Sequence, residues 1–205
     1  MPGRLFLTES LSAAAAELGP ALGDLAPDSP RFNIQPGQEV CALSPRGWQR
    51  MRWGLIPVGR VNARGRPVME TIINARSETL FGKSAFSGTG RAVLPVNGWY
   101  EWTGKARAKT AWRLSPKAGG FLYFACITDK WIAPGGQEVL QLATVTCPPN
   151  ADVDRVHHRM GVLLHPEDVP LWLTGIPETV SSLMVPWPDG LLDIELAKGV
   201  DWSGP

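Results

Sequence analysis

Short β-prone runs separated by glycine-containing turns constrain the fold of this chain more than any other feature. Five such runs follow one another between residues 91 and 146: RAVLPV, GWYEW, TAWRLS, GFLYFACIT and EVLQLATVT. Asn-Gly or Gly-Gly pairs at 97–98, 119–120 and 135–136 separate several of them. Strands at such short spacing pair with their sequence neighbours. The spacing predicts a meandering, largely antiparallel sheet or barrel.

The rest of the chain adds one more hairpin and short helices. EVCALS and WQRMRWGLI flank the turn SPRG and predict two paired strands. ESLSAAAAEL predicts a helix capped by Thr8 and ended by Gly19, and Asn150 can cap a helix in NADVDRVHH. PEDVPLWL and PETVSSLM begin with proline, as short helices often do, and APDSPRFNIQPGQ is interpreted as an ordered connection. Together they predict an α+β fold, with one domain over residues 1–205.

Composition narrows the class of protein further. The chain is 44% hydrophobic and 19% charged, with a net charge of +1 and no run of eighteen apolar residues, so no membrane association is expected. No signal peptide pattern is found. Three widely spaced cysteines argue against a disulfide framework and a zinc site, and favour the reducing cytoplasm. The common metal, nucleotide and serine-hydrolase motifs are absent, so neither metal nor cofactor is expected.

Arginines recur in short clusters. Six of them fall between residues 46 and 66, and DRVHHRM adds two more. Such clusters form solvated faces more often than phosphate-binding grooves, so charge alone leaves nucleic-acid binding as the less frequent alternative.

Two motifs carry titratable side chains in unusual company. Two of the three histidines stand together in HHRM, and an imidazole suits proton transfer near neutral pH, although a single histidine is more often structural. WYEW places Glu101 between aromatic residues, where a carboxyl group loses hydration and favours its neutral form. Strand alternation would equally well turn Glu101 to solvent, and the isolated pattern favours that interpretation.

NARSET brings an amide, a guanidinium and a carboxylate together. Asn74 can orient a reacting group and Arg76 can hold a phosphate, or the hexapeptide is an ordinary polar loop with Ser77 capping a helix. Nine tryptophans are many for this length, and Trp53 and Trp102 lie beside polar motifs. Most tryptophans pack in cores, but one beside arginines can stack on an unpaired base.

Six segments in order resemble one known family. They are GR at 3–4, RFNIQPGQEV, MRWGLIP, NARSETL, RAVLPVNGWYEW and DRVHHRMGVLL. From residue 3 to about 165 the chain resembles the SRAP family, the SOS response-associated peptidases or abasic-site processing proteins. The resemblance implies a single α+β domain with a curved sheet or barrel that recognises abasic sites in single-stranded DNA, acting in the DNA damage response as a monomer.

The resemblance also implies roles for residues at matching positions. Family members remove the initiator methionine and attach to the abasic sugar through a cysteine at position 2, closing a thiazolidine. Asn74 would position the terminal amine or sugar, Glu101 would exchange protons with the sugar ring oxygen, and His157 would assist ring opening. Arginines would face the DNA backbone and tryptophans would support an unstacked base; these are Arg4, Arg76, Arg159, Trp53 and Trp102.

Proline at position 2 departs from this pattern. Pro2 stands where the family has its cysteine, and no other cysteine lies near the terminus, so the thiazolidine is in doubt. A secondary amine still attacks an aldehyde, and gives a charged iminium that is a strong electron sink. The hypothesis is therefore a transient iminium that promotes β-elimination, a lyase activity. Gly161, where the family usually has proline, is expected to loosen the following strand without loss of chemistry.

Three alternatives remain open at this point. The chain is a non-catalytic single-stranded DNA-binding variant, or a peptidase whose activity is limited to removal of Met1. Alternatively, Pro2 is an engineered replacement or a reading error for the native residue.

Overall fold

The computed structural model describes residues 2–23, 29–57, 64–65, 70–105, 108–133 and 135–204. It has the predicted α+β class. The strands are β1 Leu5–Leu7, β2 Arg31–Ile34, β3 Glu39–Ser44, β4 Gly47–Trp53, β5 Asn74–Arg76, β6 Gly90–Val96, β7 Gly98–Thr103, β8 Thr110–Pro116, β9 Leu122–Ile132, β10 Glu138–Cys147, β11 Met160–Gly161, β12 Leu163–Leu164 and β13 Leu192–Leu196. The helices are α1 Leu11–Leu18, α2 Ala151–Asp154, α3 Val169–Thr174 and α4 Pro177–Val180, with 3-10 turns at Ser77–Thr79, Ser84–Phe86, Pro166–Asp168 and Ser181–Leu183.

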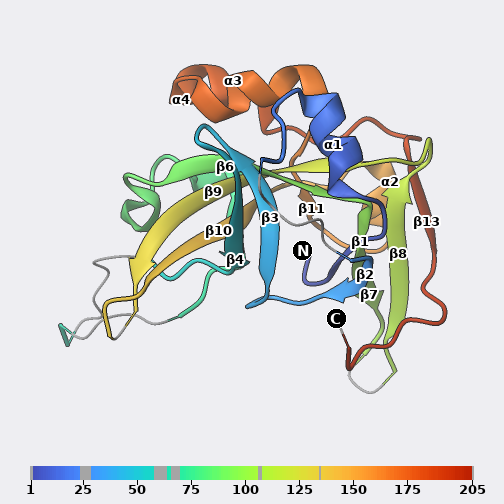
Figure 1. Cartoon of the computed structure of the whole chain (residues 1–205). Helices are drawn as coiled ribbons and strands as arrows, with labels where there is room; N and C mark the ends of the chain where they lie inside the picture. Colours follow the sequence, from blue (N-terminus) through green and yellow to red (C-terminus); the bar gives the residue numbers. More distant parts are fainter. Residues whose placement is uncertain are drawn as a thin grey trace.

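Five strands close into a barrel. β3 pairs with β4, β4 with β10, β10 with β9, β9 with β6, and β6 returns to β3 (Figure 1). All of these pairs are antiparallel except β4 with β10, and β5 also runs parallel to β10. The meander or barrel expected from the short runs is confirmed. The hairpin of β3 and β4 forms around the predicted SPRG turn.

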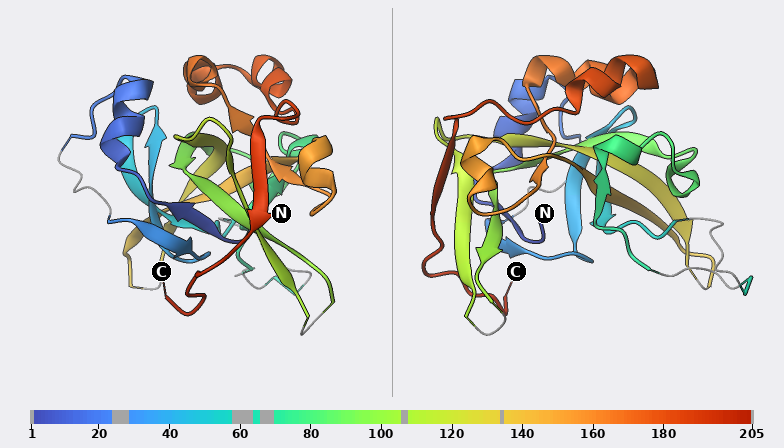
Figure 2. Two further views of the ribbon diagram at one scale, coloured as in Figure 1. Left: turned by 90° about the vertical axis from the view of Figure 1, so that its right-hand side faces the viewer. Right: turned by 180° about the vertical axis from the view of Figure 1, so that it is seen from behind.

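A second, antiparallel sheet packs beside the barrel. Its strand order is β13-β8-β7-β1-β2, and Figure 2 shows it from its outer side in the left view. One hydrophobic cluster of buried side chains extends from this sheet, through Leu5 and Trp99, into the barrel strands. Trp99 meets the ring of Phe124 on β9 edge to face, with centroids 5.6 Å apart. The N-terminal end of the chain lies where the barrel and the second sheet meet (Figure 1).

The Asn97-Gly98 pair carries the chain from the barrel to the second sheet, and does not close a hairpin. β6 pairs with β3 and β9, whereas β7 pairs with β1 and β8. Asn97 is buried, and its Oδ1 accepts hydrogen bonds from the backbone N–H of Thr8 at 2.7 Å and of Glu9 at 3.0 Å. A Cβ at Gly98 would lie 2.1 Å from the carbonyl oxygen of Leu114, so only glycine fits. The Asn-Gly pair predicted a turn, and contacts with residues distant in sequence determine which strands that turn connects.

Capping of the first helix differs from the prediction. Ser10 caps α1 by accepting from Ser12 N–H at 3.2 Å, while the Thr8 hydroxyl donates to Asn97 Oδ1 at 3.4 Å. The predicted stop at Gly19 is confirmed, with φ of 90°. Asn150 caps α2 as predicted, by accepting from Val153 N–H at 3.0 Å.

Two further segments also differ from the sequence-based interpretation. Part of APDSPRFNIQPGQ is strand β2 rather than a connection, and residues 24–28 lie outside the described residues. Arg76, and not Ser77, precedes the 3-10 turn in NARSET, and no side chain caps it.

Helix α4 starts at Pro177 as expected, whereas PEDVPLWL divides into a 3-10 turn that starts at Pro166 and helix α3, which starts at Val169. Both helices lie across the top of the barrel in Figure 1. Trp172 of α3 donates its indole N–H to Ala92 O on β6 at 2.9 Å. Gly161 lies within β11, and a Cβ there would come 2.1 Å from the Phe124 ring, so close packing requires this glycine. In the described part of the chain, no helix is long and apolar enough to cross a membrane.

Candidate functional site

A chain of hydrogen bonds holds the N-terminal segment against the barrel. Asn74 on β5 donates from Nδ2 to the carbonyl oxygen of Pro2 at 2.9 Å. Thr144 on β10 donates its hydroxyl to Asn74 Oδ1, because the parallel pairing of β10 with β5 places these two residues opposite each other. A hydroxyl that donates to Oδ1 leaves the amide N–H₂ facing Pro2. Thr144 therefore fixes the orientation of the Asn74 amide.

The pairing of β1 with β7 brings the same segment along the strand that carries Glu101. Leu5 lies opposite Trp99, and Tyr100 donates its N–H to the carbonyl oxygen of Arg4 at 3.0 Å. The same register places Arg4 opposite Tyr100 and, one residue further, Gly3 opposite Glu101. Pro2, itself buried, thus enters the molecule between Asn74 on the barrel side and Glu101 on the second sheet.

Glu101 faces the interior, so the expectation that it points to solvent is wrong. Only 3% of the residue is exposed. Burial raises the pKa of its carboxyl group to about 7, because the charged form loses hydration. Trp99 shares this face and is fully buried, which explains the dehydration. At neutral pH a substantial share of Glu101 is protonated and can act as an acid.

His157 follows α2 and faces Glu101 across the site. Its Nε2 lies 4.0 Å from Glu101 Oε2. Its Nδ1 lies 3.0 Å from both the backbone N–H and the carbonyl oxygen of Arg159, and these two contacts suit opposite tautomers of the ring. Burial lowers the pKa of His157 to about 4, so the ring is neutral at pH 7.

These groups can donate and accept protons in one place. A protonated carboxyl group and a neutral imidazole face each other, with Asn74 aligning the terminal backbone. Sites of acid–base catalysis typically raise the pKa of the group that acts as the acid and lower the pKa of the group that acts as the base. Among the residues described, no group of histidine, cysteine, aspartate and glutamate side chains is arranged to hold a metal ion.

Arg159 belongs to a second, fully occupied pair. Its guanidinium is buried and binds Glu78 with two contacts, Nη1 to Oε1 at 2.6 Å and Nη2 to Oε2 at 2.9 Å. It also donates to the carbonyl oxygen of Thr146 at 2.6 Å. Hydrogen bonding to Arg159 lowers the pKa of Glu78 to about 2. Contact of Arg159 with a DNA phosphate stays a prediction, and it would require this pair to open.

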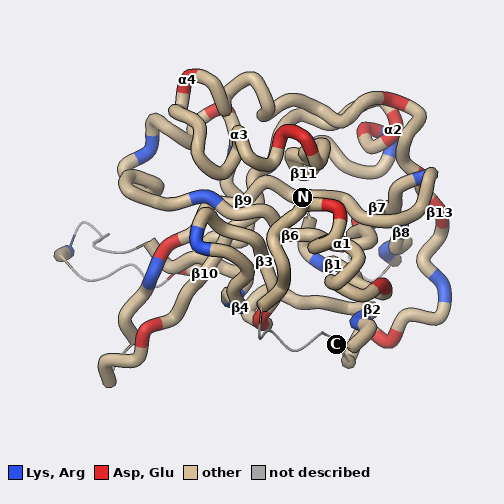
Figure 3. Tube along the Cα trace, turned by 45° about the horizontal axis from the view of Figure 1, so that its top comes forward, with Lys and Arg blue, Asp and Glu red and all other residues tan. Residues whose placement is uncertain are grey.

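The remaining predicted DNA-facing residues lie in different surroundings. Arg76 is exposed and, two residues along β5, shares a strand face with Asn74, while Arg4 is half-buried and donates to Gly3 O at 2.9 Å. Basic and acidic positions are interspersed along the chain, as Figure 3 shows. Arg76 is thus the exposed one of the three predicted arginines and lies on the strand of Asn74.

Neither predicted tryptophan reaches the Glu101 face. Trp53 is fully buried inside the barrel. Trp102 lies on the opposite face of β7 from Glu101, where its ring packs against Trp202 with centroids 5.4 Å apart. Stacking of a base on either ring stays a prediction that this placement does not favour.

Sequence reasoning missed Thr144 and the role of Glu78. Thr144 lies inside the apolar run EVLQLATVT, and only its parallel pairing with β5 brings it to Asn74. Glu78 stands in NARSET, but its partner is 81 positions away in sequence. The NARSET motif singled out the Glu78 carboxylate but not its partner. No local pattern singled out Thr144.

Comparisons with known proteins identify a matching family, similar sequences and a shared fold. The profile of the family described as SOS response associated peptidase (SRAP) matches residues 1–198. The chain is 30% identical over 169 residues to abasic site processing protein YoqW of Bacillus subtilis, covering 77% of this chain and 74% of that one. It is 28% identical to abasic site processing protein HMCES of Gallus gallus, covering 66% of this chain and 48% of that one. A crystal structure of a Bacteroides thetaiotaomicron protein shares the fold, with a TM-score of 0.81 at 20% identity, over 96% of this chain and 92% of that one.

Proposed function

This chain belongs to the SOS response associated peptidase family, and on that premise we propose that it processes abasic sites in single-stranded DNA through the amine of Pro2. The relatives that carry the name abasic site processing protein support the DNA lesion as substrate. The observation that carries the proposal is the hydrogen bond from Asn74 to the Pro2 carbonyl, which ties position 2 to the barrel. The pairing of β1 with β7 directs the same segment toward Glu101, and Glu101 Oε2 lies 4.0 Å from His157 Nε2.

The reaction begins with removal of Met1, which exposes the secondary amine of Pro2. The nitrogen lone pair attacks C1′ of the ring-opened sugar, and the C1′ oxygen, once protonated, leaves as water. The resulting iminium acidifies the C2′–H bond. Loss of that proton and cleavage of the C3′–O bond expel the 3′ phosphate, and water then hydrolyses the iminium to release Pro2.

Each site residue has a role that its environment suits. Glu101, partly protonated at neutral pH, donates a proton to the sugar ring oxygen and regains one from the C1′ hydroxyl as the aldehyde forms. It then donates that proton to the departing hydroxyl. His157, neutral at the same pH, accepts the C2′ proton. Asn74 aims the terminal residue, and Arg76 holds a flanking phosphate. In this scheme the acid and the base are separate groups.

We propose that the chain acts as a monomer in the reducing cytoplasm, where thiols such as the buried ones of Cys41, Cys126 and Cys147 persist.

Borohydride trapping on single-stranded DNA with one abasic site tests the proposal. Intact mass first establishes that Met1 is absent. We expect a covalent adduct only when borohydride is present, together with strand cleavage when it is omitted. A wild-type protein that lacks Met1 and gives neither adduct nor cleavage would overturn the chemistry.

Two variants at position 2 serve as matched controls. Pro2→Cys restores the thiol of the family and should give an adduct that survives without borohydride. Pro2→Ala supplies a primary amine without a thiol and should still be trapped. If Pro2→Cys reacts and the wild type does not, the chain is a non-catalytic binding variant. If purified protein retains Met1, even a peptidase limited to its own first residue is excluded.

A further inference from the structure

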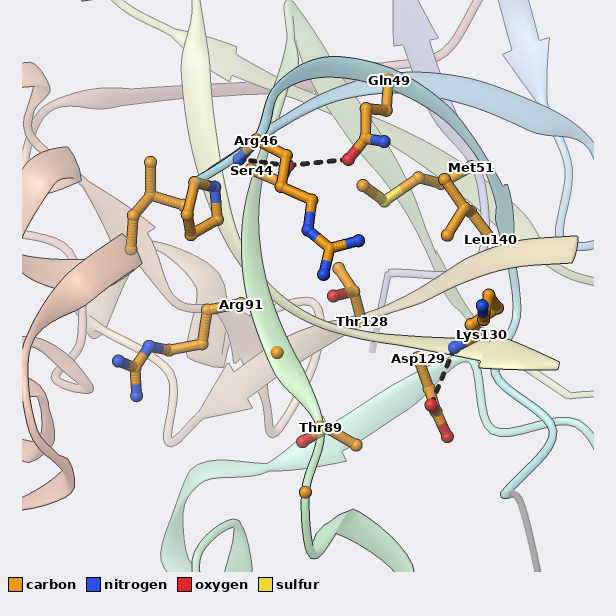
Figure 4. Close-up of a pocket in the computed structure, with 14 residues that line it drawn as sticks. Ser44, Arg46, Gln49, Met51, Thr89, Arg91, Thr128, Asp129, Lys130 and Leu140 are labelled. Carbon is orange, nitrogen blue, oxygen red and sulfur yellow. Dashed lines mark hydrogen bonds between the residues drawn. The ribbon is translucent and has the colours of Figure 1, made fainter.

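A separate cavity opens at the end of the barrel where β3 turns into β4. Its volume is about 440 Å³, and residues from all five barrel strands and from α3 line it (Figure 4). We call this cavity the barrel mouth, and its lining includes Ser44, Gln49, Gly90, Thr128, Leu140 and Leu173. Mouths of β-barrels and cavities of this size commonly hold small molecules.

The barrel mouth is a blind pocket. Below it the interior is filled by Ala92, Cys126 and Leu142, each fully buried. On β10, Leu140 at the mouth and Thr144 beside Asn74 are four residues apart, or about 13 Å along the strand. The packed interior therefore separates the mouth from the site around Pro2.

Two arginines at the mouth have no carboxylate partner among the described residues. Arg46 extends across the opening in Figure 4, and its guanidinium makes no hydrogen bond to the described part of the chain. Arg91 donates to the carbonyl oxygen of Gly175 and lies 5.9 Å from the centroid of the Trp172 ring, while its Nε is buried without a partner. Burial lowers the pKa of Arg91, as expected for a cation that lacks an anion nearby.

The other charges at the mouth do not neutralise these two. Lys130 lines the cavity, but its ammonium group pairs at 2.8 Å with Glu138, which is not part of the lining. Asp129 lines the cavity, but its Oδ1 accepts from Lys130 N–H at 2.7 Å and the carboxylate points away from Arg46 in Figure 4. Arg46 thus keeps a positive charge at the opening that no carboxylate of the described residues neutralises, while Arg91 points away from Arg46 in Figure 4.

Neutral groups around the mouth complete a mixed lining. Thr128 carries a hydroxyl toward the cavity, and a Cβ at Gly90 would come within 3.0 Å of it, so glycine leaves this hydroxyl accessible. Met51, Leu140 and Leu173 supply apolar surface opposite these polar groups. Guanidinium and hydroxyl groups bind phosphate oxygens, and apolar surface accepts a base or sugar.

We propose that the barrel mouth binds a phosphate ester of nucleotide size. The phosphate lies against Arg46 and the Thr128 hydroxyl, and the organic part lies against Met51 and Leu140. The ester is either a free nucleotide or the terminal nucleotide of a DNA strand, because both present the same group. This site does not depend on the chemistry at Pro2.

Calorimetric titration at low salt tests the site in the full-length protein. We expect a deoxynucleoside 5′-monophosphate to bind at least 10-fold more tightly than the corresponding nucleoside. Arg46→Gln should weaken nucleotide binding about 10-fold and Thr128→Val about 3-fold. Arg155→Gln removes an exposed arginine elsewhere and serves as the matched control, with no change expected. Equal affinity for nucleotide and nucleoside, or equal loss in Arg155→Gln, would overturn the proposal.

Oligonucleotides distinguish the two sources of the phosphate. If a 5′-phosphorylated strand without an abasic site competes with the mononucleotide and its 5′-hydroxyl counterpart does not, the site takes DNA ends. If neither strand competes, the ligand is a free nucleotide. Arg46→Gln should trap abasic DNA at the wild-type rate, so failure of this site and failure of the Pro2 chemistry are seen separately. No binding of any phosphate ester sinks the inference.

Discussion

Residues 157 and 159 take part in two acid–base pairs that lie side by side and behave in opposite ways. Glu101 and His157 are 4.0 Å apart, and burial drives the carboxyl pKa up to about 7 and the imidazole pKa down to about 4. Glu78 and Arg159 are 2.6 Å apart, and their hydrogen bonds pull the carboxyl pKa down to about 2. Near pH 7 the imidazole of the first pair is neutral and a substantial share of its carboxyl group is protonated, whereas the second pair is ionised.

Distance and exposure explain the difference. The side chain of Glu78 is 46% exposed, so water and two charge-assisted hydrogen bonds stabilise its charge, whereas Glu101 is 3% exposed. Arginine cannot give up its proton, so its pair stays ionic, while histidine can. Glu101, which faces His157, thus becomes a proton donor, and Glu78, which binds Arg159, becomes a structural anchor.

The largest expected effect comes from removing the carboxyl proton of the first pair. Glu101→Gln keeps the shape of the side chain but cannot donate a carboxyl proton, so borohydride-trapped adduct should form about 100-fold more slowly. Because the pKa of Glu101 is about 7, its protonated fraction falls as pH rises above 7. The ratio of wild-type to variant rates should therefore be constant below pH 7 and shrink above it.

Glu78→Gln is the matched control for this rate effect, since Glu78 belongs to the ionised pair. Its pH profile of trapping should follow that of the wild type. A wild-type to Glu101→Gln ratio that does not change with pH would contradict the role of Glu101 as the acid.

The second-largest effect is expected when Arg159, the buried member of the ionised pair, is replaced. Arg159→Met removes both contacts to Glu78 and the hydrogen bond to the Thr146 carbonyl, and leaves that carbonyl without this donor. We expect the free energy of unfolding to fall by about 2–3 kcal/mol, less than for a fully buried pair because Glu78 regains water. Denaturant unfolding measures it. An unchanged midpoint would show that the pair is not an anchor.

How much of these pairs the sequence predicts depends on how local their contacts are. The neighbouring residues and the family resemblance predict Glu101 and His157 as site residues, yet the WYEW pattern alone favours a solvent-exposed Glu101. Its burial follows from packing of the second sheet against the barrel, through contacts such as that of Trp99 with Phe124. Strand alternation predicts which side chains share a face, but not which face is covered.

The barrel and its hairpin were predicted because turn residues and β-prone runs are local signals. The parallel pairing of β10 with β5 joins residues about 70 positions apart and has no local signal, so Thr144 was missed. For the same reason the Asn97-Gly98 pair was expected to make an ordinary turn. Position 2 is the opposite case, since the identity of Pro2 alone determines that the terminal amine is secondary, whatever the fold.

The third effect concerns how stability depends on pH between 4.5 and 6.5. Glu101 has a pKa of about 7 in the folded chain against an ordinary 4.5, so the folded state holds more protons and stability falls as pH rises. His157 has a pKa of about 4 against an ordinary 6.5, so the unfolded state holds more protons and stability is lost as pH falls. The two trends oppose each other, and the wild type should be nearly flat in this window.

Single variants should reveal the hidden slopes. Stability of Glu101→Gln should rise with pH between 4.5 and 6.5, and stability of His157→Gln should fall, each by at most about 1.4 kcal/mol per pH unit. Urea unfolding at half-unit pH steps measures both. Two variants with the same sign of slope would show that the two groups are not shifted in opposite directions.

The smallest effect concerns acid stability from the ionised pair. Glu78 has a lowered pKa of about 2, so its contribution is present above about 4.5 and is lost as pH falls toward 2. Because the side chain is half exposed, solvent screening keeps the contribution to about 1 kcal/mol. Glu78→Gln should lose that amount at pH 6 and approach the wild type near pH 2. A deficit that stays constant down to pH 2 would mean that Glu78 acts through its shape and not its charge, and the contrast between the two pairs would then rest on Glu101 and His157 alone.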